Sequence, residues 1–112
     1  MAQRPESRFP RIVRLAVEAE ADLSAIYDYT AQLWGIIQAD DYDEFLAGVM
    51  QQLAENPEIA PLAPNLKVRI YVARWKNARQ GHRVFFIETT DGITVARILH
   101  TAMNWPEHFG IV

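Results

Sequence analysis

The chain has 112 residues, enough for one domain with a hydrophobic core, and it contains no cysteine. Disulfides, thiolate nucleophiles and cysteine metal sites are therefore excluded, and we expect a protein of the reducing cytoplasm. The formal net charge of −3 disfavours a protein dedicated to binding nucleic-acid backbones, which is normally basic.

The first ten residues have no apolar core, so they do not resemble a signal peptide. We expect a flexible lead at residues 1–10 and a single domain at residues 11–112. No apolar run approaches the ~20 residues that a membrane span needs, so we expect no membrane partner. Residues 11–17, RIVRLAV, alternate in the manner of a β-strand, which we place at the edge of a sheet.

Two amphipathic helices are expected next. One runs from about Asp22, its N-cap, to Trp34, and Gly35 ends it in the left-handed conformation. The other runs from about Ile37 to Glu55, before Pro57. The connection is so short that the helices must form an antiparallel hairpin, whose apolar stripes then cover a sheet. The stripes are Leu23, Ile26, Tyr27, Thr30, Leu33 and Trp34 in the first helix, and Tyr42, Phe45, Leu46, Val49 and Leu53 in the second.

Three further strands are predicted at residues 67–75, 82–88 and 93–99. Asp91 and Gly92 join the last two in a tight turn, because both tolerate a positive φ. Strict alternation places Ile93, Val95, Arg97 and Leu99 on one face, with Ala96 and Ile98 on the other. Both faces of this hairpin carry apolar bulk, which predicts central strands covered on both sides. Residues 101–112 are irregular, with one helical turn after Pro106.

The order strand, helix, helix, strand, strand, strand predicts an α+β fold of two layers. The N-terminal strand joins the edge of a three-stranded antiparallel meander, and the antiparallel helical hairpin covers one face. The hairpin leaves the other face uncovered, so some apolar surface should stay open for a partner. The candidates for this surface are Ile12, Val68, Ile70, Phe85 and Ile98.

Charge is distributed unevenly along the chain. No Lys or Arg occurs between Arg14 and Lys67, an interval rich in Asp and Glu, whereas residues 67–100 are predominantly basic. Acidic helices lying over a basic sheet would explain this pattern. A basic sheet surface offered to an acidic partner would explain it equally well.

Two histidines and two arginines lie at strand ends that should meet in the sheet: His82 with Arg83, and Arg97 with His100. His82, Arg83 and His100 could form the acid–base and phosphate-binding set of a metal-free ribonuclease. We favour hydrogen bonding to nearby loops, because no carboxylate or tyrosine clearly completes a site. The spacing of the three histidines, including His108, fits no metal-ligand pattern, so we expect neither a metal nor a cofactor.

Aromatic and basic residues also gather in the expected loops, where partner contacts are common. Those that suit contact with a target are Trp75, Lys76, Arg79, Trp105 and His108. Alternatively, Trp105 and Phe109 fold back over the core.

The chain resembles the RelE/ParE superfamily of toxins, and its ending resembles the ParE branch. The resemblance covers about residues 11–109. It rests on Ala21-Asp22-Leu23, Ile26, Tyr29, Leu53-Ala54 and Asn56-Pro57 in the helical hairpin, and on His82-Arg83-Val84-Phe85-Phe86, Asp91-Gly92, Arg97-Ile98-Leu99-His100 and Met103-Asn104 in the last third.

This resemblance implies a toxin of a type II toxin–antitoxin system, wrapped by the C-terminal segment of a cognate ParD-like antitoxin. DNA would be contacted only through the antitoxin. ParE-type toxins are expected to poison DNA gyrase, whereas RelE-type toxins cleave messenger RNA on the ribosome. Arg83 matches one arginine of the ribonuclease set, but Thr101 and Ala102 stand where a basic residue is expected and no tyrosine follows. We therefore expect a gyrase inhibitor. A RelE-type ribonuclease and an inactive antitoxin-binding member are the alternatives.

Overall fold

The computed structural model describes residues 10–64 and 66–108. Four strands form one sheet in the order β1-β4-β3-β2, with β1 (Ile12–Leu15) parallel to β4 (Gly92–His100) at one edge. β2 (Arg69–Ala73), β3 (His82–Thr89) and β4 form the antiparallel meander. The predicted α+β architecture is therefore confirmed.

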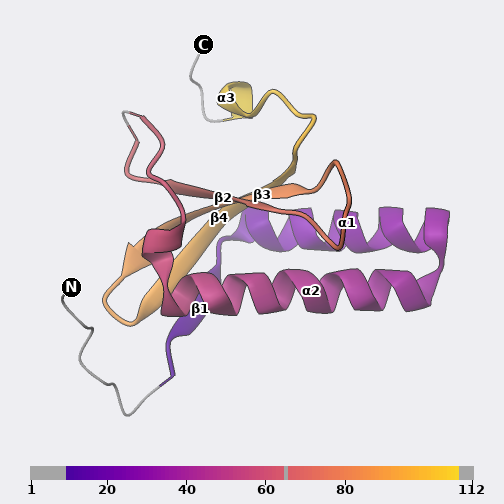
Figure 1. The fold of residues 1–112 in the computed structure, drawn as a ribbon, viewed down its shortest axis with the longest axis horizontal. Helices are drawn as coiled ribbons and strands as arrows, with labels where there is room; N and C mark the ends of the chain where they lie inside the picture. Colours follow the sequence, from indigo (N-terminus) through magenta and orange to yellow (C-terminus); the bar gives the residue numbers. More distant parts are fainter. Residues whose placement is uncertain (1–9, 65, 109–112) are drawn as a thin grey trace.

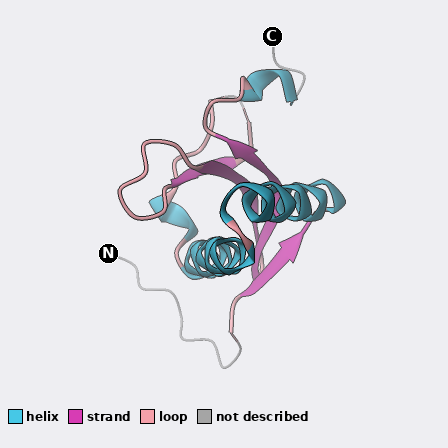
Figure 2. Cartoon of the chain, turned by 90° about the vertical axis from the view of Figure 1, so that its right-hand side faces the viewer, coloured by secondary structure: helices cyan, strands magenta, loops and turns pink. Residues whose placement is uncertain are grey.

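The helical hairpin lies against one face of this sheet (Figure 1, Figure 2). It consists of α1 (Val17–Trp34) and α2 (Ile36–Glu55), joined by Gly35, whose φ of 92° favours glycine. A short 3₁₀ turn, η1 (Pro57–Ile59), follows, and α3 (Trp105–His108) lies on the opposite side of the sheet. No described helix is long and apolar enough to cross a membrane.

The core lies between α2 and the central strands. α2 contributes Leu46, Val49, Met50 and Leu53, which meet a layer from the sheet formed by Val84, Phe86, Ile93, Val95 and Ile98. α1 contributes Ala19, which is fully buried, and Leu23 and Ile26, which are partly buried against the same core. Both helices therefore pack on the sheet, and α2 supplies more of the fully buried side chains.

The start of α1 differs from the prediction. The helix begins at Val17, so this residue belongs to the helix and not to the strand, and Asp22 is not the N-cap. The backbone N–H of Ala16 still donates to Val95 O, which ties the chain to β4 up to the first turn. Glu18 and Glu20 in that turn suit the positive end of the helix dipole.

The expected alternation in β4 is broken by a β-bulge. Phe85 pairs with Arg97 and Phe86 pairs with Val95, which leaves Ala96 without an opposite residue. The bulge turns Ile98 toward the helices, where it joins the core, contrary to strict alternation.

Gly92 is required for a different reason from the one predicted. It does not adopt a positive φ. A Cβ at this position would lie 1.8 Å from the carbonyl oxygen of Ile12, because the backbone of β1 passes directly alongside. The residue permits close pairing of the edge strand and not a left-handed turn.

The turned end of the hairpin projects past the sheet (Figure 1). Leu33 and Trp34 are consequently exposed, although the helical stripe predicted that they face the core. The last turn of α1 and the first turn of α2, which flank Gly35, therefore have no sheet beneath them.

Candidate functional site

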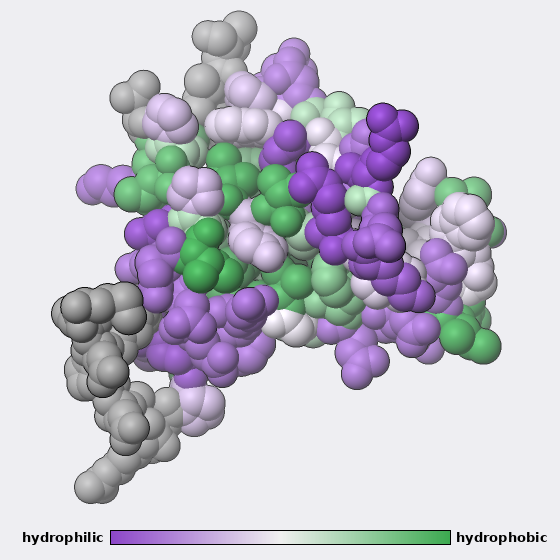
Figure 3. All heavy atoms as spheres, viewed as in Figure 1, coloured by the Kyte–Doolittle hydropathy of each residue, from purple (hydrophilic) through white to green (hydrophobic). Residues whose placement is uncertain are grey.

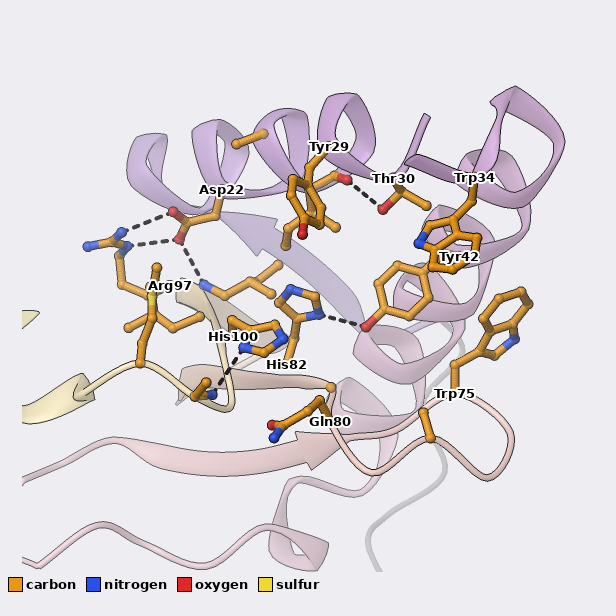
Figure 4. Close-up of a pocket in the computed structure, with 18 of the residues that line it drawn as sticks. Asp22, Tyr29, Thr30, Trp34, Tyr42, Trp75, Gln80, His82, Arg97 and His100 are labelled. Atoms are coloured by element: carbon orange, nitrogen blue, oxygen red, sulfur yellow. Dashed lines mark hydrogen bonds and ion pairs between the residues drawn. The ribbon is translucent and has the colours of Figure 1, made fainter. Parts of the chain in front are cut away.

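A groove of about 680 Å³ opens between α1 and the strand ends that carry His82 and His100. Figure 4 shows it from the side, with Asp22 and Arg97 at one end and Trp34 and Trp75 at the other. Its lining is mainly apolar. It comprises Asp22, Ala25, Ile26, Tyr29, Thr30, Trp34, Gln38, Tyr42, Trp75, Ala78, Gln80, Gly81, His82, Arg97, Ile98, Leu99, His100, Ala102 and Met103.

At one end of the groove, Asp22 binds Arg97 through two hydrogen bonds. Arg97 Nε donates to Asp22 Oδ2 over 2.8 Å, and Nη2 donates to Oδ1 over 3.0 Å. The backbone N–H of Ile98 also donates to Oδ2, over 2.9 Å. β1 pairs with β4 only as far as Val95. At Ile98 the Asp22 carboxylate therefore accepts the backbone hydrogen bond that a neighbouring strand would otherwise accept. The hydrogen bond that Arg97 donates to Asp22 raises the pKa of Arg97, which keeps the guanidinium charged.

The middle of the groove holds Tyr42, His82 and His100. Tyr42 Oη and His82 Nδ1 share a hydrogen bond of 2.6 Å, and the two imidazole rings lie 5.4 Å apart edge to face. His100 Nδ1 accepts a hydrogen bond from the backbone N–H of Ala102. Burial raises the pKa of Tyr42 to about 12.

Burial, and then the charge of His100, lowers the pKa of His82 to about 4, against a smaller opposing effect of Asp22. At neutral pH Tyr42 and His82 are therefore both uncharged.

The three residues of the ribonuclease alternative do not meet in one cleft. His82 pairs with His100 across β3 and β4. Arg83, the next residue in β3, points to the opposite face of the sheet, where Nη1 donates to Thr101 O over 2.7 Å. A phosphate in the groove could not contact this guanidinium and the histidines together.

The apolar surface expected to stay open is found only in part. Phe85 is fully buried, because the ring of Trp105 packs against it with centroids 5.5 Å apart. Ile98 is buried in the core by the bulge. The expectation of exposure was wrong for both. Ile12 is exposed, and Val68 and Ile70 are half-buried.

The five residues predicted to contact a target lie on two separate surfaces. Trp75, Lys76 and Arg79 belong to the β2–β3 connection beside the groove, where the Lys76 ammonium lies 4.4 Å from the Trp75 ring. Trp105 and His108 belong to α3, on the other side of the sheet. Trp105 thus folds back on Phe85, whereas Phe109 lies outside the described residues.

Sequence reasoning missed most of the groove. Tyr42 was assigned to the core stripe and Asp22 to a helix cap, and Tyr29 was given no role beyond the family resemblance. The partners of Tyr42 and Asp22 lie 40 or more residues away in the chain, so no local pattern indicates them.

Comparisons with known proteins agree on one family. A family model described as ParE toxin of type II toxin–antitoxin system, parDE, matches residues 13–105. The chain is 33% identical over 97 residues to Toxin ParE1 of Caulobacter vibrioides, covering 87% of this chain and 96% of the relative. It is 31% identical over 91 residues to Toxin ParE1 of Mycobacterium tuberculosis, covering 80% and 89%.

A similar fold occurs in the solved structure of the chromosomal ParDE TA system from P. aeruginosa. The TM-score is 0.65 at 22% identity, and the match covers 80% of this chain and 95% of that one.

Proposed function

Because this chain belongs to the ParE family of type II toxin–antitoxin toxins, which implies an antitoxin partner, we propose that it inhibits DNA gyrase by binding alone. We further propose that the antitoxin silences the toxin by laying an amphipathic segment in the groove. In this account the toxin contacts DNA only through the antitoxin.

The main support for inhibition by binding, and against RNA cleavage, is that Arg83 lies apart from His82 and His100. General acid–base cleavage of RNA needs a titrating group and a free cation around one phosphate. In the groove the nearer guanidinium is that of Arg97, and Asp22 already binds it through two hydrogen bonds. His82, whose pKa is about 4, is a poor acid at neutral pH.

The shape and exposure of the groove support the antitoxin proposal. Ala25, Tyr29 and Trp34 of α1 line the groove and are exposed, so this side of the helix is available to a second chain. Trp34 and Met103 are exposed along the groove, and burying them would favour complex formation. Arg74, Lys76 and Arg79 flank it on the β2–β3 connection, so acidic residues are expected on that side of the antitoxin segment.

Gyrase supercoiling assays test the proposed target. Purified toxin should inhibit supercoiling or trap cleavage complexes, and prior mixing with the antitoxin should restore activity. Primer extension on translated messenger supplies the contrasting test, because induction should leave transcripts intact. Unchanged supercoiling together with cleaved messenger would replace the gyrase proposal with the ribonuclease alternative.

The substitution Ala25→Trp tests the groove. Ala25 lines the groove on α1, so an indole here occupies space that the antitoxin segment needs. Antitoxin affinity should fall roughly tenfold or more, since overpacking costs about 1–3 kcal/mol. Ala47→Trp is the matched control, because Ala47 is exposed on α2 and does not line the groove. Equal affinities of the two variants would exclude the groove as the antitoxin site.

A further inference from the structure

The turn between α1 and α2 carries an apolar surface that the groove does not account for. We call it the hairpin tip, and it consists of Leu33, Trp34, Ile36 and Ile37, all of which are at least half exposed. Figure 3 shows hydrophobic and intermediate side chains gathered at this end of the molecule. With no sheet beneath them, these side chains contribute little to the core, so their exposure indicates an interaction surface.

Acidic side chains lie behind the hairpin tip, within about two turns of Gly35. Tyr27 Oη donates to Asp40 Oδ1 over 2.6 Å, and this hydrogen bond, with the nearby charges of Asp43 and Asp28, raises the pKa of Tyr27. Asp40 therefore binds this hydroxyl, and Asp28 and Asp43 act on it through their charge. Neither α1 nor α2 contains a Lys, Arg or His to neutralise them.

We propose that the hairpin tip is the surface with which this toxin contacts gyrase, through an apolar site on the enzyme bordered by basic residues. The inference rests on the proposed function and assigns the target-binding surface within it. An enzyme that binds DNA presents basic surfaces to the phosphates. The hairpin tip is apolar and bordered by carboxylates, so it is complementary to an apolar site bordered by basic residues. A second copy of this chain fits less well, because a two-fold contact would bring two acidic borders together.

The hairpin tip also adjoins the groove. Trp34 belongs to both, since it lines the groove and is exposed at the turn. An antitoxin segment that reaches Trp34 would overlap the gyrase-binding surface. Neutralisation would then be direct competition, with no conformational change in the toxin.

The substitution Ile37→Gln tests the apolar part. Ile37 is 80% exposed and does not line the groove, so the variant should fold and should bind the antitoxin as the wild type does. Its affinity for gyrase should fall roughly tenfold, because a buried isoleucine side chain would be lost from the interface. Val17→Gln is the matched control, since Val17 is 78% exposed at the far end of α1. That variant should inhibit supercoiling within twofold of the wild type.

Charge is tested by the double variant Asp28→Asn with Asp43→Asn, compared with Glu20→Gln and Glu55→Gln. Both pairs remove two negative charges from exposed positions on the hairpin, but only the first pair lies near the tip. The first pair should weaken gyrase binding and reduce its dependence on salt, whereas the second should leave both unchanged.

Three results would overturn the inference. In the first, wild-type toxin inhibits gyrase and Ile37→Gln inhibits equally. In the second, Ile37→Gln loses affinity for the antitoxin and not for gyrase. In the third, the substitution only converts a self-associated toxin to a monomer in sedimentation. Wild-type toxin without any effect on gyrase would instead refute the proposed function itself.

Discussion

Replacing Asp22 by asparagine should destabilise the fold more than any other single-atom change in the groove. The carboxylate accepts three hydrogen bonds, two from Arg97 and one from the backbone N–H of Ile98. An asparagine has one acceptor oxygen, and its amide would face donors on the remaining side. At least one of the three bonds is therefore lost, and Arg97 keeps its charge without the carboxylate that binds it.

The loss can be estimated from the burial of the pair. Hydrogen bonds to charged groups contribute about 1.5–3 kcal/mol each when buried. The side chains of Asp22 and Arg97 are 14% and 25% exposed, so water compensates for part of the loss. We expect Asp22→Asn to lower the free energy of unfolding by about 2 kcal/mol. With a urea m-value of about 1–3 kcal/mol/M, the unfolding midpoint falls by about 1 M.

A second Arg–Asp pair provides the control. Arg14 and Asp91 also form a two-bond contact, at 2.8 Å, but their side chains are 49% and 46% exposed. Asp91→Asn should therefore shift the urea midpoint clearly less than Asp22→Asn does. Equal shifts, or no shift for Asp22→Asn, would contradict the view that this carboxylate completes the open edge of β4.

Three other changes test separate parts of the structure. Gly92→Ala should cost about 3 kcal/mol of stability in chemical denaturation, because its Cβ would overlap the carbonyl oxygen of Ile12. Gly48→Ala is the control, since Gly48 lies in open space on α2 and alanine there should stabilise the protein by about 1 kcal/mol. If Gly92→Ala had no effect on stability, β1 would not be closely paired with β4. The pKa of His82 is lowered to about 4 in the folded protein, so on acidification the unfolded chain takes up this proton before the folded protein does. The free energy of unfolding should therefore fall as the pH drops from about 6.5 to 4. His82→Gln should flatten this part of the stability profile, and an identical profile would refute the assignment. Tyr42→Phe removes the hydrogen bond to His82 and should cost about 1 kcal/mol in thermal unfolding without altering gyrase inhibition. Lost inhibition would instead place Tyr42 in the contact with gyrase.

The sequence was sufficient for the architecture, because local patterns determine it. Alternation, helical stripes and Gly35 predicted the two helices and the meander, and the Asp91-Gly92 dipeptide correctly located the hairpin between β3 and β4. What failed depends on contacts between distant segments. A bulge at Ala96 moved Ile98 into the core, and the packing of Trp105 hid Phe85. Neither event leaves a periodic trace in the sequence.

The functional surfaces were harder to predict for a related reason. The predicted open surface was the far face of the sheet, on the argument that one hairpin covers one face. In the structure the hairpin leaves part of its own stripe exposed, at Leu33 and Trp34, because its turned end extends past the sheet. Periodicity shows which residues share a face of a helix, but not whether anything lies opposite that face.

A titration of gyrase with toxin tests the central claim most directly. At a fixed gyrase concentration, an inhibitor that acts by binding alone should reduce supercoiling in proportion to its amount, and inhibition should saturate near one toxin per binding site. Supercoiling that stays unchanged at every ratio, with messenger cleaved by far less toxin than ribosomes, would contradict the account.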